Sequence, residues 1–145
     1  MKFFLELPIN KPRAEVWKIF DDPQNIVNWQ PTLTKVENMS GTQGQPGAVS
    51  KLSYSENGRE FSLTEKIIHR AEPDQLDSLY ENNFADNTIK NTFIVVGENE
   101  TLWKVEVTYA FKTILMKIMG PVMKKNLVAR TQRDMDRFKE FVEKI

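Results

Sequence analysis

The chain has 145 residues, with 20 Lys and Arg, 20 Asp and Glu, one histidine and no cysteine. This length suits one domain with a core of its own, and the balanced charge gives no electrostatic case for nucleic acid or an anionic membrane as partner. The lack of cysteine excludes disulfides, thiolate metal sites and cysteine nucleophiles.

The first residues give no sign of a targeting segment. Their apolar run breaks at Glu6, no cleavage site of small residues follows, and no stretch approaches transmembrane length. We therefore expect no signal peptide, no stable membrane insertion and a cytoplasmic protein.

The chain begins with a strand and two short helices. Residues Lys2 to Pro8 alternate between apolar and other side chains, which predicts a strand. Helical spacing then predicts a helix over Pro12–Phe20 that ends at the Asp21-Asp22-Pro23 run, and a second over Pro23–Trp29 that ends at Pro31.

Six strand-like segments follow, separated by short turns. Asn57-Gly58 is the clearest turn, because a type I′ turn needs positive φ at both central residues. The short gaps predict that the strands pair as an antiparallel meander. The six segments are Thr32–Met39, Ala48–Glu56, Arg59–Arg70, Gln75–Asn83, Asn87–Val96 and Thr101–Phe111.

The last residues, Thr113 to Ile145, read as one long amphipathic helix. Apolar residues recur at helical spacing, and about 24 residues after Pro121 would span roughly 36 Å. Its inward positions are Met119, Met123, Leu127, Met135, Phe138, Val142 and Ile145. Arg130, Thr131 and Asp134 fill the middle of this face, so we expect a cavity beneath the helix there.

This element order predicts an α+β domain over residues 1–145. A curved seven-stranded antiparallel sheet wraps around the long C-terminal helix, and the two short helices after the first strand plug one end of the sheet.

Local sequence detail resembles the helix-grip superfamily, also called START-like or SRPBCC, with its polyketide cyclase/dehydrase and birch-pollen-allergen groups. The run from Pro12 to Pro23, with Val16-Trp17 inside it, resembles the opening helix of that family, and Asn25, Trp29 and Pro31 resemble its continuation. Glu72-Pro73-Asp74-Gln75-Leu76 is similar to a turn between two central strands, and Met119-Gly120-Pro121 to the start of the closing helix. The resemblance implies the same fold. Members of this superfamily bind lipids or polyketides, catalyse cyclisation or dehydration, or bind partner proteins, so the resemblance implies a function of one of these kinds.

The predicted ligand-binding residues lie on the inward faces of the strands and of the last helix. Alternate strand residues share a face, and the mostly apolar face should point inward, as expected for a small-molecule site with a few polar groups. In the Arg59–Arg70 strand this face ends at His69, where we expect solvent. The candidates are Tyr54, Phe61, Glu65, Tyr80, Phe93, Trp103, Tyr109, Met119, Met123, Leu127 and Arg130.

Glu65 is the most informative of these residues. A carboxylate on an apolar face needs a partner, and Arg130 is the candidate. The pair can be structural, it can orient a polar ligand group, or Glu65 can act as a general base with a raised pKa. The tyrosines and methionines also suit plain core packing. His69 has no second histidine, so we expect no metal and no cofactor.

Three functions are consistent with this sequence. The leading prediction is binding of a hydrophobic or amphipathic small molecule, such as a lipid, sterol-like or polyketide-like compound, between the sheet and the C-terminal helix. The first alternative is a polyketide cyclase or dehydratase-type enzyme with Glu65 as base. The second is a protein-partner-binding module, which requires an exposed apolar patch around Trp29, Pro31 and Leu33 and a cavity too small for a ligand.

Overall fold

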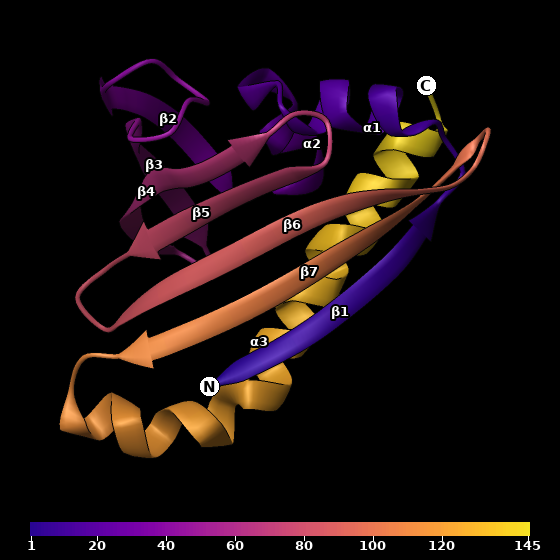
Figure 1. Cartoon of the computed structure of the whole chain (residues 1–145). Coiled ribbons are helices and arrows are strands. Elements are labelled where there is room, and N and C mark those ends of the chain that lie inside the picture. Colours follow the sequence, from indigo (N-terminus) through magenta and orange to yellow (C-terminus); the bar gives the residue numbers. More distant parts are fainter.

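The computed structural model describes all 145 residues, and its element order matches the prediction (Figure 1). The second predicted helix is a short 3₁₀ turn followed by one α-helical turn. The elements are β1 (Lys2–Ile9), α1 (Arg13–Phe20), η1 (Pro23–Asn25), α2 (Ile26–Trp29), β2 (Leu33–Ser40), β3 (Val49–Glu56), β4 (Arg59–Ala71), β5 (Gln75–Glu81), β6 (Ala85–Gly97), β7 (Glu100–Phe111) and α3 (Ile114–Glu143).

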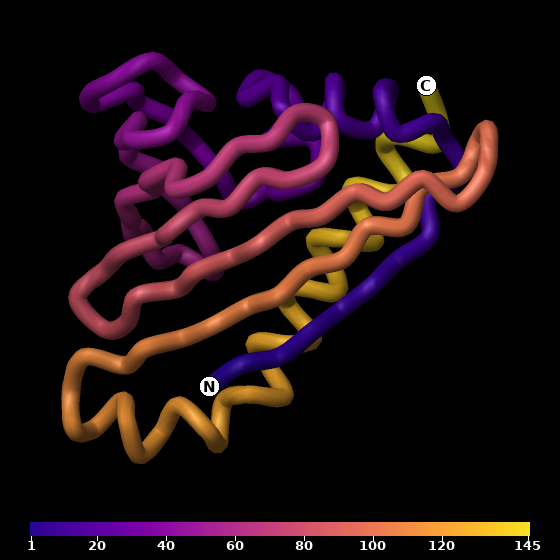
Figure 2. Tube along the Cα trace, in the orientation of Figure 1, coloured from indigo at the N-terminus to yellow at the C-terminus, as the bar shows by residue number.

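All seven strands form one antiparallel sheet in the order β1-β7-β6-β5-β4-β3-β2. The strands from β2 to β7 pair with their neighbours in sequence, which confirms the predicted meander, while β1 closes the far edge beside β7. The sheet curves, and α3 runs along its inner side (Figure 2). The segment with α1 and α2 lies across one end of the sheet (Figure 1).

The turn between β3 and β4 has the predicted form. Asn57 has a φ of 50° and Gly58 a φ of 77°, the left-handed pair that a type I′ turn requires. This turn sets the register of the whole hairpin, from Glu56 opposite Arg59 to Val49 opposite Lys66.

A bulge in β4 corrects one part of the predicted pattern. Ile67 pairs with Ser78, but His69 pairs with Asp77, so one extra residue lies in β4 between these positions. An extra residue reverses the alternation of side chains. His69 is therefore exposed, and Arg70, predicted on the outer face, points to the inner side.

The core joins the second half of α3 to the short helices and the sheet. Met135, Phe138 and Val142 of α3 are fully buried. Phe138 also belongs to a cluster of aromatic rings whose neighbouring centroids lie 5.1–6.4 Å apart. The rings of this aromatic cluster are Phe20, Trp29, Phe93, Trp103 and Phe138. Phe93 and Trp103, predicted as ligand-binding, thus hold the core together.

The first half of α3 has a different helical phase from the predicted one. Gly120 is buried, and a Cβ on it would lie 2.2 Å from Cε2 of Phe111. Only glycine permits this close approach of the helix to the end of β7. Met119, predicted to face inward, is therefore 42% exposed.

Candidate functional site

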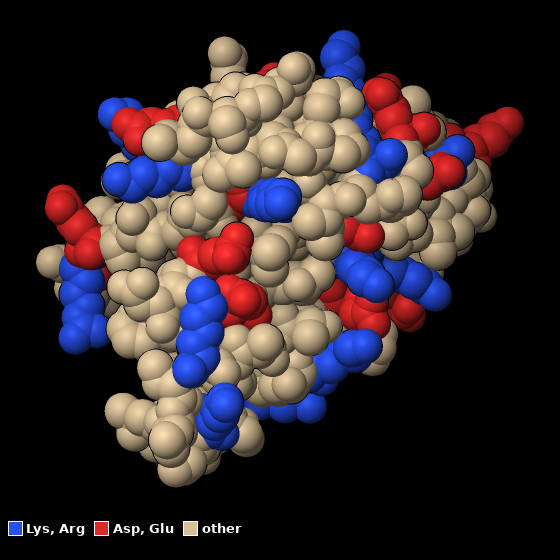
Figure 3. Space-filling view, turned by 60° about the vertical axis from the view of Figure 1, so that its left-hand side comes forward, with Lys and Arg blue, Asp and Glu red and all other residues tan.

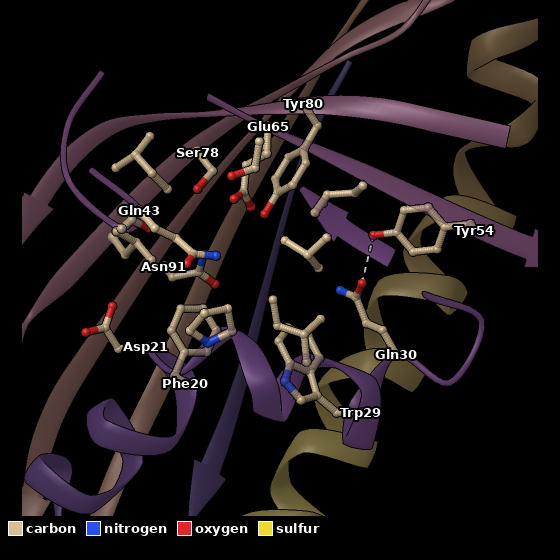
Figure 4. A pocket seen from close by; sticks show the side chains of 18 residues that line it. Phe20, Asp21, Trp29, Gln30, Gln43, Tyr54, Glu65, Ser78, Tyr80 and Asn91 are labelled. Carbon is tan, nitrogen blue, oxygen red and sulfur yellow. Dashed lines mark hydrogen bonds between the residues drawn. The ribbon is translucent and has the colours of Figure 1, made fainter. Parts of the chain in front are cut away.

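A cavity of about 90 Å³ lies between the short helices and the inner face of β2 to β6 (Figure 4). Half of its 18 lining residues are hydrophobic. The apolar side includes Phe20, Ile26, Trp29, Leu52, Ile67 and Leu76, and the polar side includes Gln30, Ser50, Glu65, Ser78, Tyr80 and Asn91. No residue of α3 lines it, so this cavity does not lie beneath the middle of α3, where the sequence predicted one.

Glu65 and Tyr80 form the polar centre of this cavity. They are directly opposite in the β4–β5 ladder, and Ser50 is opposite Glu65 in β3. The Tyr80 hydroxyl points toward the Glu65 carboxyl (Figure 4). Burial raises the pKa of Glu65 above its ordinary 4.5, and the neighbouring Tyr80 hydroxyl has a smaller, lowering effect on it. The same surroundings raise the pKa of Tyr80, first through burial and then through the charge of Glu65.

Tyr54 and Gln30 close one end of the cavity. The Tyr54 hydroxyl donates a 2.9 Å hydrogen bond to Oε1 of Gln30 (Figure 4), which ties β3 to the residue that ends α2. Burial raises the pKa of Tyr54, so its phenol stays protonated as a donor. The ring also stacks on Phe61, at 5.2 Å between centroids.

Arg70 organises the opposite end. Its two terminal nitrogens donate to the two carboxylate oxygens of Asp21 at 2.6 and 2.7 Å, and one of them also donates to the carbonyl of Gly44 at 3.2 Å. The guanidinium lies 5.3 Å from the centre of the Trp17 ring. Arg70 therefore joins the end of α1 to the loop that borders the cavity. The bulge in β4 hid this residue from sequence reasoning, because strict alternation placed it outside.

Asn91 supplies a fixed polar point on the cavity wall. Its side-chain oxygen accepts a 3.0 Å hydrogen bond from Nε1 of Trp103, and its Nδ2 donates to the carbonyl of Leu76 at 3.3 Å. Asn91 is not among the ligand-binding residues predicted from the sequence. Gln30 was missed altogether, because the end of a four-residue helix has no periodic signal.

Three predicted site residues line the cavity, namely Tyr54, Glu65 and Tyr80. Their role in binding stays a prediction. The remaining residues lie elsewhere: Phe61 is 38% exposed beside Tyr54, Tyr109 stacks between Phe3 and Phe111, and Met123 and Leu127 are partly buried on α3.

The predicted pair of Glu65 and Arg130 does not form. Arg130 instead makes an ion pair with Glu56, at the end of β3. Glu65 lies further along the sheet, opposite Tyr80 in the β4–β5 ladder. Arg130 thus points toward the sheet, as the helical spacing predicted, but its partner there is Glu56 and not Glu65.

The apolar patch required of a partner-binding module is absent at its predicted place. Leu33 is only 5% exposed, and Trp29 is packed within the aromatic cluster. Both side chains pack inward, so Pro31 is the only one of these three residues that is exposed.

Asp134 on α3 is a second acidic group with a displaced pKa. Burial raises its pKa from an ordinary 3.8 to about 6, against the charges of Arg130, Arg137 and Arg133, which lower it. Glu56 adds to the rise. The folded state thus holds this proton more tightly than the unfolded chain does. The stability that the proton contributes is complete below about pH 3.8 and is lost as the pH rises through about 6.

We expect Asp134→Asn to remove this pH dependence. The difference in free energy of unfolding between the wild type and the variant should change by about 2 kcal/mol from about pH 4 to about pH 7, with the wild type losing stability. Urea unfolding at a series of pH values measures it. Asp136→Asn, two residues further along and exposed, is the control. If the free energy of unfolding changed with pH in the same way for the wild type and for Asp134→Asn, the raised pKa of Asp134 would be contradicted.

No three side chains of the metal-ligating types come together in a cluster. None of the helices combines the length and apolar character needed to cross a bilayer.

Comparisons with known proteins agree with this architecture. Ara h 8.0201 superposes with a TM-score of 0.80 at 19% identity, over 100% of this chain and 99% of its own. A START superfamily protein from Mycobacterium smegmatis gives 0.81 at 15% identity, over 99% and 97%. The Zhui aromatase/cyclase from Streptomyces sp. R1128 gives 0.76 at 13% identity, over 99% and 93%. These likenesses show the helix-grip fold. A search of curated proteins finds no match.

Family membership follows from the sequence itself. Residues 5–143 match the model of a family described as polyketide cyclase/dehydrase and lipid transport, nearly the whole chain. This protein is therefore a member of the polyketide cyclase/dehydrase and lipid transport family, within the START-like, or SRPBCC, superfamily.

Proposed function

We propose that this protein binds a small amphipathic molecule in the cavity between the short helices and β2 to β6. One observation carries the proposal. The cavity has an aromatic side, with Phe20 and Trp29, that faces a polar side centred on Glu65 and Tyr80. Such a site suits a ligand with an apolar ring or chain and a hydroxyl or carbonyl group at one end. The family description, which includes lipid transport, supports the same class.

The size of the cavity limits the form of this ligand. A volume of about 90 Å³ is below the roughly 300–1,000 Å³ of pockets for drug-sized molecules. A lipid, a sterol-like or a polyketide-like compound therefore fits only if the wall moves. The short helix α2, with four residues, is the natural element to move, because the Tyr54–Gln30 hydrogen bond and the Trp29 ring are what hold it against the sheet.

Native mass spectrometry of the protein purified from cells, followed by extraction of bound compounds, tests the proposal first. A discrete added mass is the expected result and identifies the ligand class. A bare protein that also shows no thermal shift with fatty acids, sterols or aromatic phenols would overturn it.

Glu65→Gln tests the polar side of the site. We expect the variant to keep its affinity for purely apolar probes and to lose about tenfold or more for probes with a hydroxyl group, because a hydrogen bond to a charged group is lost. Isothermal titration measures both. Glu60→Gln, on the same strand but exposed, should bind both kinds of probe like the wild type. Equal loss for both kinds in Glu65→Gln would speak against a polar role.

A second candidate is proton-transfer catalysis of the cyclase or dehydratase type. It is favoured by one observation, the raised pKa of a carboxyl that borders a cavity and has a tyrosine beside it. Glu65 would take a proton from an enolisable ligand, and Tyr80 would donate to the developing oxyanion. In this case Glu65→Gln retains binding and lowers turnover by about 10² to 10⁴. A binding protein has no turnover to lose.

A further inference from the structure

The zero net charge conceals an uneven distribution of charge along the chain. No Asp or Glu occurs between Glu106 and Asp134, and this acid-free segment carries six Lys and Arg residues. Lys112 and Arg130 make ion pairs with Asp86 and Glu56. The ion pairs of the molecule leave the other three lysines of the segment free, and these are Lys117, Lys124 and Lys125. All three belong to the first half of α3.

The same half of α3 exposes an apolar stripe. Its residues follow helical spacing along one side: Ile114 (79% exposed), Leu115 (67%), Ile118 (66%), Met119 (42%) and Val122 (73%). Phe84, 58% exposed, lies beside its start, since its carbonyl accepts a hydrogen bond from the backbone N–H of Lys112 at 2.8 Å. An exposed patch of this kind marks an interaction surface.

The apolar stripe cannot turn inward, because the opposite side of the helix is already occupied. Gly120 packs against Phe111 there. Pro121 lies within the helix, and α3 changes direction after its first turns, so that this half projects from the lower end of the molecule (Figure 1). In the space-filling view this end carries tan and blue side chains, and the red ones lie higher (Figure 3).

We propose that the first half of α3 docks on the surface of an anionic lipid bilayer. The apolar stripe would enter the boundary between headgroups and acyl chains, and Lys117, Lys124 and Lys125 would face the lipid phosphates. No span is involved, since the helix lies on the surface. This proposal goes beyond the cavity and its ligand, because it uses none of the residues that line the cavity.

Charge decides between a bilayer and a second copy of the chain. Two copies joined through the apolar stripe would bring both sets of lysines together without an acid in the segment to neutralise them. The tip of β6 and β7 offers a comparison within the molecule. It also exposes apolar side chains, Val95 and Val96, but Glu98 and Glu100 lie beside them. Of these two surfaces, only that of α3 combines exposed apolar residues with unpaired positive charge.

Flotation with vesicles of phosphatidylcholine, with and without phosphatidylserine, tests the proposal. We expect the full chain to float with the phosphatidylserine vesicles only, and to detach as salt is raised. Lys124→Ser with Lys125→Ser should weaken binding by roughly 10- to 30-fold, and Ile118→Ser with Val122→Ser should abolish it. Val95→Ser with Val96→Ser is the matched control and should bind like the wild type. Circular dichroism and the melting temperature establish that each variant is folded.

Three results would overturn the proposal. They are no binding to phosphatidylserine vesicles, equal binding to both kinds of vesicle, and unchanged binding of the folded Ile118→Ser, Val122→Ser variant. A concentration-dependent dimer in sedimentation that is lost in this variant, with no flotation, would also overturn it and assign the apolar stripe to a second copy of the chain.

Discussion

Replacing Phe138 by alanine should lower the free energy of unfolding by about 3–5 kcal/mol. Phe138 is fully buried, and its ring lies 5.6 Å from that of Phe20, 5.4 Å from Trp29 and 5.1 Å from Trp103. It thus connects α3 with both short helices and with β7. Its loss removes apolar burial and leaves a cavity among rigid rings that cannot collapse to fill it.

Urea unfolding followed by tryptophan fluorescence measures this effect. Phe4→Ala is the matched control, because Phe4 is 69% exposed on β1 and its removal should cost within about 0.5 kcal/mol. Similar costs for the two variants would contradict the view that the aromatic cluster holds α3 in place.

Arg70→Ala should cost about 2–3 kcal/mol, since it removes charge-assisted hydrogen bonds and leaves Asp21 without its partner. The Arg70 side chain is only 12% exposed, and that of Asp21 26%, so water replaces these bonds incompletely. The contact with the Trp17 ring is lost as well. Because Arg70 also binds the carbonyl of Gly44, the loop at that end of the cavity should exchange its amide hydrogens faster.

Arg70→Lys separates geometry from charge. Lysine keeps the charge but cannot span both oxygens of Asp21 as the guanidinium does, so we expect a smaller but clear loss of stability. Arg137→Ala is a control, because Arg137 is 45% exposed and pairs with Asp134 within one helix, where such pairs contribute little. If Arg70→Ala cost no more than Arg137→Ala, the proposed role of Arg70 would be wrong.

Local sequence determined most of the fold because the relevant forces act between near neighbours. The Asn57-Gly58 turn needs positive φ at two residues, and this requirement alone set the β3–β4 register. Periodicity found all seven strands and the long helix, with errors of a few residues at their ends, such as the start of β6 at Ala85 rather than Asn87. The same periodicity placed Tyr54, Glu65 and Tyr80 on the inner face, where they line the cavity.

Only the tertiary structure decided how these faces meet. A single extra residue in β4 brought Arg70 inside and left His69 exposed. The contact of Gly120 with Phe111 rotated the first half of α3 away from its predicted phase, so that Met119 became exposed. Arg130 pairs with Glu56 at the end of β3 instead of with Glu65. Each outcome depends on side chains that are far apart in the chain but compete for the same space in the fold. The periodicity of one segment shows which of its faces is apolar, but not which residues of another segment pack against that face.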